Sequence, residues 1–383
     1  MDFSETDEQR LWRQTVHDFC AQEVKPQAAE MDSKAQFNAE AVHKMAPLGL
    51  LGLNIPESYG GAGIDAVSGT LALEELGWAC GGTALSVAAH NGLCCSAIAA
   101  FGDETQRQTW LPELASGEKG LGALALTEPG AGSDLAGGVR TKAELQGDEW
   151  VITGQKAWIT NASLAPVIVT LCRTGSEDNS RSFSLILVPA GSEGLHIHPA
   201  EKKMGTRASP THAVSFDGVR VPREAVLGEP GQGLPQTLHI LDGGRVGVAA
   251  LAVGLARSAL EEAVRYAAER RAFGRPLSEH EALRFMMADA GTQIEASRLL
   301  VRSAAWRKDQ GLKFTQEAAM AKLFATEMAE RVCRDAIQVL GAYGYSSDYP
   351  VERIYRDARL MTIGEGTSEI QRMVIARGVL GIK

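Results

Sequence analysis

One carboxylate of the sequence stands between two glycines, directly before a helical pattern. Glu365 lies within the segment 363–369, where Thr367 or Ser368 is suited to cap the helix that follows. A carboxylate before a helix can simply compensate the positive end of the helix dipole. A glutamate with a glycine on either side also suits a general base that faces a substrate. The segment alone leaves both interpretations open.

Two strand patterns end in residues that suit a flat or phosphorylated ligand. The first, 124–133, turns at glycines that let a ligand approach the backbone, and it offers the hydroxyls of Thr127 and Ser133. The second ends in Trp-Ile-Thr at 158–160, where an indole face can lie against an aromatic ring. A plain tight turn and ordinary core packing explain the same residues equally well.

The C-terminal half holds two further candidates. Arg270 ends a long helical pattern, where the helix dipole stabilises a cation and where a guanidinium can also grip a pyrophosphate. The segment 338–345 runs from a helix into a glycine break at Gly341, which would let a ligand or a partner backbone come close. Neither feature is specific to one function by itself.

Signatures of other enzyme classes are absent from the sequence. GxxxxGK[ST] and GxSxG do not occur, and the near-match to GxGxxG at 120–125 leads into a strand and a turn instead of opening a helix. The six cysteines and eight histidines show no CxxC or HExxH spacing, so we expect reduced, buried thiols and no metal site. A Rossmann enzyme, an α/β-hydrolase and a metalloenzyme are therefore disfavoured.

The bulk composition predicts a soluble, cytoplasmic protein. The 383 residues carry a formal net charge of −9, so no face for binding nucleic acid is expected. No run of about 18 uncharged apolar residues predicts a membrane span. The N-terminal MDFSETDEQR is acidic where a secretory signal is basic, so no targeting segment is expected in this chain.

The hydrophobic spacing changes twice and divides the chain into three units. Helical spacing fills residues 1–120 and includes a nearly uncharged stretch, 82–101, that we expect to be buried. Short alternating runs separated by turns follow over 121–230 and predict a small antiparallel β domain. Long helical patterns return over 231–383 and predict a four-helix bundle. This order predicts an α+β fold that is mainly α, without the alternation of a parallel sheet.

Five short segments, taken in this order, resemble the acyl-CoA dehydrogenase family over essentially the whole chain. They are TEPGAGS at 127–133, WIT at 158–160, RxxFG at 270–274, QVLGxxGY at 338–345 and EGTSEIQR at 365–372. The pattern is most similar to the short-chain (butyryl-type) and bacterial members. The resemblance implies an N-terminal helical domain, a central β domain and a C-terminal four-helix bundle. It also implies a homotetramer, built as a dimer of dimers, with FAD between the domains.

The resemblance assigns cofactor and substrate contacts residue by residue. The flavin ring would contact Leu124, Ala125, Leu126, Thr127, Gly132, Ser133, Trp158, Ile159 and Thr160. The adenosine-diphosphate portion would contact Arg270, Phe273, Gln338, Val339, Leu340, Gly341 and Ala342 across a dimer interface. Thr367, Ser368 and Glu369, at a helix start, would also meet FAD. The acyl-CoA would contact Ser133, Asp242, Gly243, Gly244, Arg245 and Gly366.

Glu365 matches the catalytic base of the family. By the resemblance, its carboxylate removes the α-proton of an acyl-CoA while a hydride leaves the β-carbon for flavin N5, which gives the trans-2-enoyl-CoA. Burial beside an acyl chain would raise the pKa of Glu365 and strengthen it as a base. Donors to the thioester oxygen, from the backbone N–H of the base and a ribityl hydroxyl, form an oxyanion hole. Electron-transfer flavoprotein is the implied electron acceptor.

Several positions depart from the family pattern or narrow the substrate. Isovaleryl- and long-chain-type members carry the base directly before the arginine equivalent to Arg245, where this chain has Gly244, so Glu365 is the sole candidate. Gly364 replaces a tyrosine of short- and medium-chain members, and Glu281 replaces a glutamine that contacts the FAD adenosine. The segment 87–93, which by the resemblance should line the acyl cavity, has no arginine, and this favours a monocarboxylic acyl chain over a dicarboxylate. The first hypothesis is a short or branched acyl-CoA.

Two other functions stay open beside a dehydrogenase of fatty-acid or branched-chain catabolism. An oxygen-using flavoenzyme of the same fold, such as an acyl-CoA oxidase or a nitroalkane oxidase, would release peroxide quickly. A DNA-associated flavoprotein would need a basic face, which the net charge of −9 disfavours.

Overall fold

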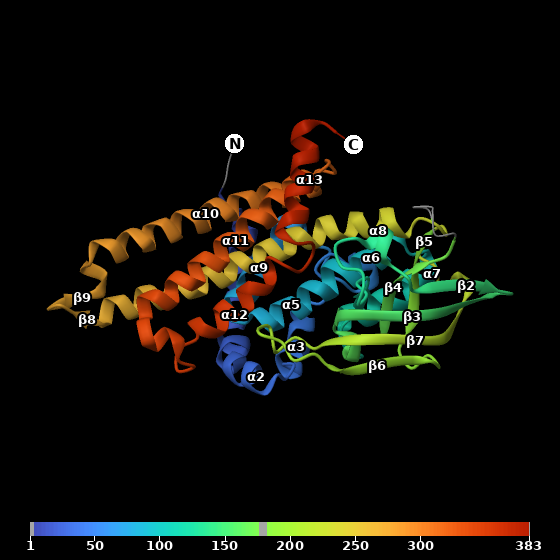
Figure 1. Ribbon diagram of the computed structural model, residues 1–383, viewed down its shortest axis with the longest axis horizontal. Helices are drawn as coiled ribbons and strands as arrows, with labels where there is room; N and C mark the ends of the chain where they lie inside the picture. Colours follow the sequence, from blue (N-terminus) through green and yellow to red (C-terminus); the bar gives the residue numbers. More distant parts are fainter. Residues whose placement is uncertain (1–3, 176–181, 383) are drawn as a thin grey trace.

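The computed structural model describes residues 4–175 and 182–382. A sheet occupies one end of the long axis, long helices run to the other end, and the N-terminal helices lie against their junction (Figure 1). The mainly helical α+β fold predicted from the sequence is confirmed.

The N-terminal part consists of short helices around two apolar ones. Thr6 starts the first helix with a capping box, as Asp103 starts the last. The uncharged stretch 82–101 is helical and largely buried, as predicted. The helices are α1 (Asp7–Phe19), α2 (Ala28–Lys34), α3 (Ala39–Met45), α4 (Ala66–Ala79), α5 (Gly81–Ala89), α6 (Ser96–Phe101) and α7 (Glu104–Ser116); a π-helical turn, η5 (His90–Cys95), joins α5 to α6.

The central sheet is mixed. Its strands are β1 (Ala123–Ala125), β2 (Lys142–Gln146), β3 (Glu149–Thr160), β4 (Val167–Arg173), β5 (Phe183–Pro189), β6 (Leu195–Ala200) and β7 (Thr211–Pro222). The order is β1-β4-β2-β3-β7-β6, with β5 also paired to β4. β4 runs parallel to β1 and to the end of β2, so the predicted antiparallel pairing is wrong for these two pairs. The long connections from β1 and β2 to β4 allow a parallel crossover.

The sheet curls so that both faces are covered. One face packs on residues of α6, α7 and the start of α9, such as Ile98, Leu114 and Ile240. The other face closes mainly on its own side chains, including Ile152, Ile186 and Phe216. β4 is therefore buried along its whole length.

The C-terminal part is built on long helices that lie side by side (Figure 1). They are α9 (Gly233–Glu269), α10 (Glu281–Asp309), α11 (Thr315–Leu340) and α12 (Val351–Met361), and α13 (Ser368–Leu380) crosses them. A two-stranded hairpin, β8 (Arg271–Ala272) and β9 (Arg275–Pro276), follows α9, and a 3-10 turn, η9 (Gly341–Tyr345), follows α11.

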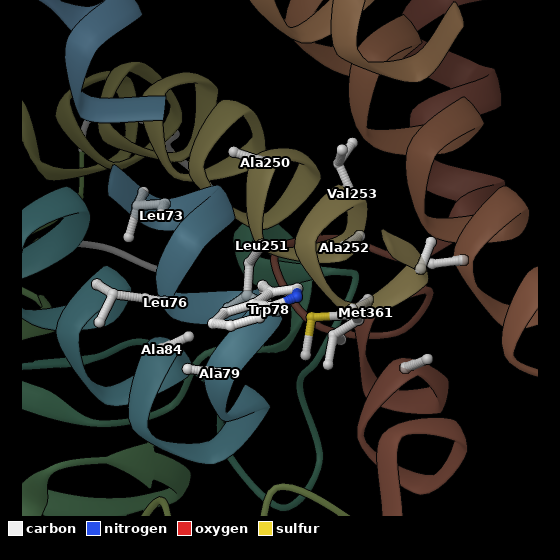
Figure 2. Close-up of a cluster of buried hydrophobic side chains, with 14 of the residues drawn as sticks. Leu73, Leu76, Trp78, Ala79, Ala84, Ala250, Leu251, Ala252, Val253 and Met361 are labelled. Atoms are coloured by element: carbon white, nitrogen blue, oxygen red, sulfur yellow. The ribbon is translucent and has the colours of Figure 1, made fainter. Parts of the chain in front are cut away.

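The N-terminal helices and the bundle share one core. Leu76 and Trp78 of α4 belong to one hydrophobic cluster with Leu251 and Val253 of α9, and Leu251 lies next to Trp78 (Figure 2). The two helix backbones approach so closely that a Cβ added to Gly254 would lie 2.1 Å from the carbonyl oxygen of Glu74. Glycine is required where helices cross at this distance. This close contact fixes the position of α9 along α4.

Two helical stretches, Gly81–Phe101 and α9, are long and apolar enough to cross a membrane by length and composition. Most of each stretch is buried inside the fold. Core helices of this kind need no membrane to cover their apolar surface.

Candidate active site

A tight loop between α12 and α13 carries Glu365. The loop closes where the Ser368 N–H donates to the Thr362 carbonyl at 3.1 Å, and Thr367 then caps α13. Glu365 has a φ of 57° and Gly366 a φ of 91°. A non-glycine residue in this left-handed region costs about 1 kcal/mol, and such strain persists only where surrounding contacts hold it.

Two buried side chains hold the carbonyls of this loop. Lys322 on α11 donates from Nζ to the Gly366 carbonyl at 2.7 Å. Gln371 on α13 donates from Nε2 to the same carbonyl at 2.9 Å and to the Glu365 carbonyl at 3.3 Å. Both residues are 0% exposed. The strained conformation is therefore fixed from the inside of the fold.

The Glu365 carboxylate lies against α9. A Cβ added to Gly244 would lie 2.6 Å from Glu365 Oε2 and 3.0 Å from the Leu93 side chain, so a larger residue would force the carboxylate to move from this position. Oε2 is buried and has no hydrogen-bond partner in the described part of the chain. Burial raises the pKa of Glu365 to about 7, against the opposing charges of Arg245 and Lys322. A carboxylate with this pKa can take up or release a proton near neutral pH.

Asp242 and Arg245 form a buried pair on α9, next to Gly244. Arg245 Nη1 donates to Asp242 Oδ1 at 2.6 Å, and the Thr315 hydroxyl donates to Oδ2 at 2.6 Å. Arg245 Nε is buried without a partner among the described residues, which leaves a donor for a ligand. The predicted substrate contacts from Asp242 to Arg245 thus lie beside Glu365.

The π-helical turn η5 connects the surroundings of Glu365 to the sheet. Leu93 and Gly92 of this turn lie against Gly244. His90 accepts a hydrogen bond from the N–H of Gly122, just before β1, at 2.8 Å. Burial lowers the pKa of His90 to about 4, so the imidazole is neutral. The sequence predicted one continuous helix over 82–101 and missed this turn, a feature frequent at functional sites.

The ends of β1 and β3 meet at the predicted flavin contacts. The Ala157 N–H donates to the Thr127 carbonyl at 2.8 Å. Trp158, with a φ of 62°, lies at a register shift between Lys156 and Ile159. Its side chain is 58% exposed. A bulge that turns a large aromatic ring outward leaves its face free for a ligand.

A buried ion pair ties these two strand ends together. Lys156 is 0% exposed and donates from Nζ to Glu128 Oε1 and to the Leu126 carbonyl, both at 2.9 Å. The Glu128 carboxylate also accepts the backbone N–H groups of Arg140 and Thr141. These bonds fix the turn after β1 and the end of β3. Trp158 lies two residues after Lys156, so its exposed ring is held in a defined position.

The remaining predicted flavin contacts differ in how far their side chains are exposed to solvent. Thr127 and Thr160 are half-buried, and Gly132 and Ser133 are exposed in the turn after β1. Leu124, Ala125, Leu126 and Ile159 have buried side chains. These four residues can present only backbone groups to a ligand.

A polar pocket of about 440 Å³ opens at the start of α13. Ser368 Oγ is buried there without a partner among the described residues. Helix starts and arginines are suited to phosphate oxygens. The lining residues include Arg331, Arg334, Arg359, Thr367, Ser368 and Glu369, together with the carboxylates of Glu327 and Glu330.

The predicted adenosine-diphosphate contacts lie at another place in the chain. Arg270 and Phe273 border the β8–β9 hairpin at the far end of the bundle, away from the sheet (Figure 1). The ring of Tyr266, one turn before Arg270, lies 6.4 Å from that of Tyr343 in η9, so the 338–342 segment lies at the same end. Phe273 is 97% exposed. The single chain therefore does not bring this group to Trp158.

Two members of that group have buried side chains. Val339 and Leu340 belong to the core of the bundle, so only their backbone atoms can meet a ligand. Gln338, Gly341 and Ala342 are exposed. Glu281, the family departure, is exposed at the start of α10.

Sequence reasoning missed several residues that shape the site: Lys322, Gln371, and the Lys156–Glu128 pair. Lys322 carried a readable signal, because it lies three or four residues from the apolar Ala318, Ala319 and Ala325 on one helix face. A lysine on an apolar face must find a partner when buried. The Lys156–Glu128 pair joins residues far apart in sequence and left no local signal. Gln371 lies only five and six residues from the carbonyls that it holds, but a glutamine in the first turns of a helix does not by itself indicate such a role.

The three parts of the chain match the family models of the acyl-CoA dehydrogenases. The N-terminal domain model matches residues 6–118, the middle domain model 123–219 and the C-terminal domain model 231–380. The chain therefore belongs to the acyl-CoA dehydrogenase family and is an oxidoreductase.

Several relatives with high sequence identity indicate which type of acyl-CoA dehydrogenase this chain resembles. A probable acyl-CoA dehydrogenase of Bacillus subtilis is 49% identical, over 99% of this chain and 100% of the relative. A short-chain-specific acyl-CoA dehydrogenase of Clostridium acetobutylicum is 45% identical, over 98% and 99%. The solved butyryl-CoA dehydrogenase from Megasphaera elsdenii superposes with a TM-score of 0.96 at 39% identity, over 99% and 100%. The homologues of this chain are thus of the short-chain, butyryl type.

Proposed function

We propose that this chain is an FAD-dependent acyl-CoA dehydrogenase that forms the α,β double bond of a short or branched acyl-CoA, with Glu365 as the base. The observation that carries the proposal is the Glu365 carboxylate, whose Oε2 is buried, has no hydrogen-bond partner among the described residues, and lies against a glycine of α9. Its pKa of about 7 suits removal of a weakly acidic α-proton at neutral pH. Family membership and the short-chain relatives support the reaction class and the chain length.

The residues present fit a flavin dinucleotide. Trp158 offers an exposed ring face beside Thr127, and added side chains at Gly130 and Gly132 would meet no atom within 4 Å. The unpartnered Ser368 Oγ lies in the arginine-lined pocket. Bound FAD would supply the acceptor for the β-hydrogen and its electron pair.

The chain's own groups would then handle the proton. Glu365 would receive the α-proton on its carboxylate, and uptake of a proton removes a buried negative charge. Gly244 keeps the space in front of Oε2 clear. By the resemblance, the Glu365 N–H would donate to the thioester oxygen, and the α9 residues from Asp242 to Arg245, with Ser133 and Gly366, would contact the acyl-CoA.

Assembly and partners form part of the same proposal. Arg270, Phe273 and the segment 338–342 lie at the opposite end of the bundle from the sheet, which supports their contribution to FAD of a neighbouring subunit in a homotetramer. We also propose electron-transfer flavoprotein as acceptor, a catabolic role, a cytoplasmic location, and domains at 1–120, 121–230 and 231–383.

Reduction of the bound flavin tests the proposal. The purified protein is mixed anaerobically with acyl-CoAs of graded length and branching, and loss of flavin absorbance is followed. Glu365→Gln should keep FAD and acyl-CoA bound but lose flavin reduction by several orders of magnitude, whereas Glu30→Gln, an exposed partner of Lys34, should react normally. Normal reduction by Glu365→Gln would refute the assigned base. Rapid peroxide release in air would indicate an oxygen-using flavoenzyme instead.

A further inference from the structure

Lys322 is a buried cation whose only hydrogen bond in the described chain goes to the loop of the base. The residue is 0% exposed, and its Nζ donates to the Gly366 carbonyl at 2.7 Å. No carboxylate of the described residues forms an ion pair with it at 4.0 Å or less. A buried ammonium held by one carbonyl is costly. Its position therefore calls for an explanation beyond packing.

The charges around Lys322 come from three helices. The charges that act on it electrostatically are Glu365 of the loop, Arg245 of α9, Glu327 of α11 and Glu369 of α13. Arg245 is already paired with Asp242, and Glu369 is exposed. Oε2 of the Glu365 carboxylate has no hydrogen-bond partner in the part of the chain that the structure describes. Lys322 and Glu365 are thus the two buried charges of this cluster that lack an ion-pair partner among the described residues.

Gln371 provides an internal comparison. Its Nε2 donates to the same Gly366 carbonyl at 2.9 Å, and the residue is equally buried. Gln371 differs from Lys322 in carrying no charge. Two donors on one carbonyl, one charged and one neutral, allow the effect of the charge to be separated from the effect of the hydrogen bond.

We infer that Lys322 is a positioning residue for Glu365: its hydrogen bond to Gly366 holds the strained loop, and its charge keeps the base ionisable. This inference rests on the proposed function for its catalytic meaning, but it concerns two side chains of this chain and can be measured without turnover. Burial raises the pKa of Glu365, and the Lys322 charge opposes that rise. Without Lys322, less of the base would be ionised at neutral pH.

The first test is the titration of Glu365 itself in the FAD-loaded protein without substrate. Infrared difference spectra between pH 5 and pH 10 would follow the carboxylic C=O band, and Glu365→Gln would identify the band that belongs to Glu365. Lys322→Met should move the midpoint upward by about half to one pH unit, whereas Gln371→Met should leave it within about 0.2 units. An unchanged or lower midpoint in Lys322→Met would overturn the inference.

The second test is the pH profile of anaerobic flavin reduction by butyryl-CoA. Lys322→Met and Gln371→Met should both reduce at the high-pH plateau about tenfold more slowly than wild type, because both loosen the loop. Only Lys322→Met should also move the acid limb to higher pH. Lys119→Met, which removes a surface partner of Glu113, should match wild type. Equal profiles for the Lys322 and Gln371 variants would show a purely structural role and refute the charge effect.

Failure of the inference and failure of the proposed function give different results. If no acyl-CoA bleaches the wild-type flavin, the proposed reaction is wrong, yet the infrared midpoint still decides whether Lys322 sets the titration of Glu365. If Lys322→Met does not fold, Lys322→Gln, which keeps a donor but not the charge, should show the same upward midpoint. A wild-type midpoint in that variant would equally refute the inference.

Discussion

The buried carboxylate of Glu365 should destabilise the folded protein above neutral pH, and Glu365→Gln should remove that cost. The pKa rises from 4.5 to about 7, a difference of roughly 2.5 pH units. At about 1.4 kcal/mol per unit, this corresponds to about 3.5 kcal/mol in the free energy of unfolding. Glutamine has nearly the same side-chain shape as glutamate, but it carries no charge at any pH of the experiment.

The sign follows from which state binds the proton more tightly. Below pH 4.5 the carboxyl is protonated in both states, so variant and wild type should be equally stable. Between pH 4.5 and 7 only the folded state holds the proton, so wild-type stability falls as pH rises. Above pH 7 the difference should be constant. The stability of Glu365→Gln relative to wild type should therefore increase between pH 4.5 and pH 7.

Thermal unfolding at saturating FAD, from pH 5 to pH 8.5, measures the difference. The midpoint of Glu365→Gln minus that of wild type should grow with pH and then level off. Glu30→Gln, which removes an exposed carboxylate paired with Lys34, controls for loss of a glutamate as such. A difference that stayed flat or shrank with rising pH would show that Glu365 is not held in a desolvating environment.

Other contacts make separate predictions. Gly244→Ala places a Cβ 2.6 Å from Glu365 Oε2, so flavin reduction should fall about 100-fold while FAD stays bound, measured by stopped-flow absorbance. Lys156→Met leaves Glu128 buried without its cation and should cost about 3 kcal/mol in denaturant unfolding. Trp158→Ala should weaken FAD binding about tenfold by fluorescence titration, with little loss of stability, because the ring is exposed.

Local patterns account for how much of the fold could be predicted. Helical spacing and caps predicted the long helices of the bundle, and alternation predicted the strands, because these signals act over a few residues. Strand direction is different. β1 pairs with β4 across more than one intervening strand, and nothing within either short segment encodes a parallel partner.

The site divides in the same way. Glycines and a helix cap around Glu365 marked it as a candidate, and the family resemblance then singled it out as the base. The groups that set its pKa, Arg245 and Lys322, come from other helices. Their approach depends on how α9 and α11 pack, which helical spacing does not specify. The place of Arg270 and Phe273 is likewise a property of tertiary structure.

Strain, burial and charge at Glu365 are consequences of one arrangement. The left-handed backbone turns the carboxylate toward Gly244, and that position removes it from water and raises its pKa. Each of these features lowers stability, and the buried cation and amide beneath the loop offset part of the loss. A purely structural carboxylate at a helix start would gain nothing from such an arrangement. Stability given up at one position, with support built around it, is expected of a residue that performs chemistry.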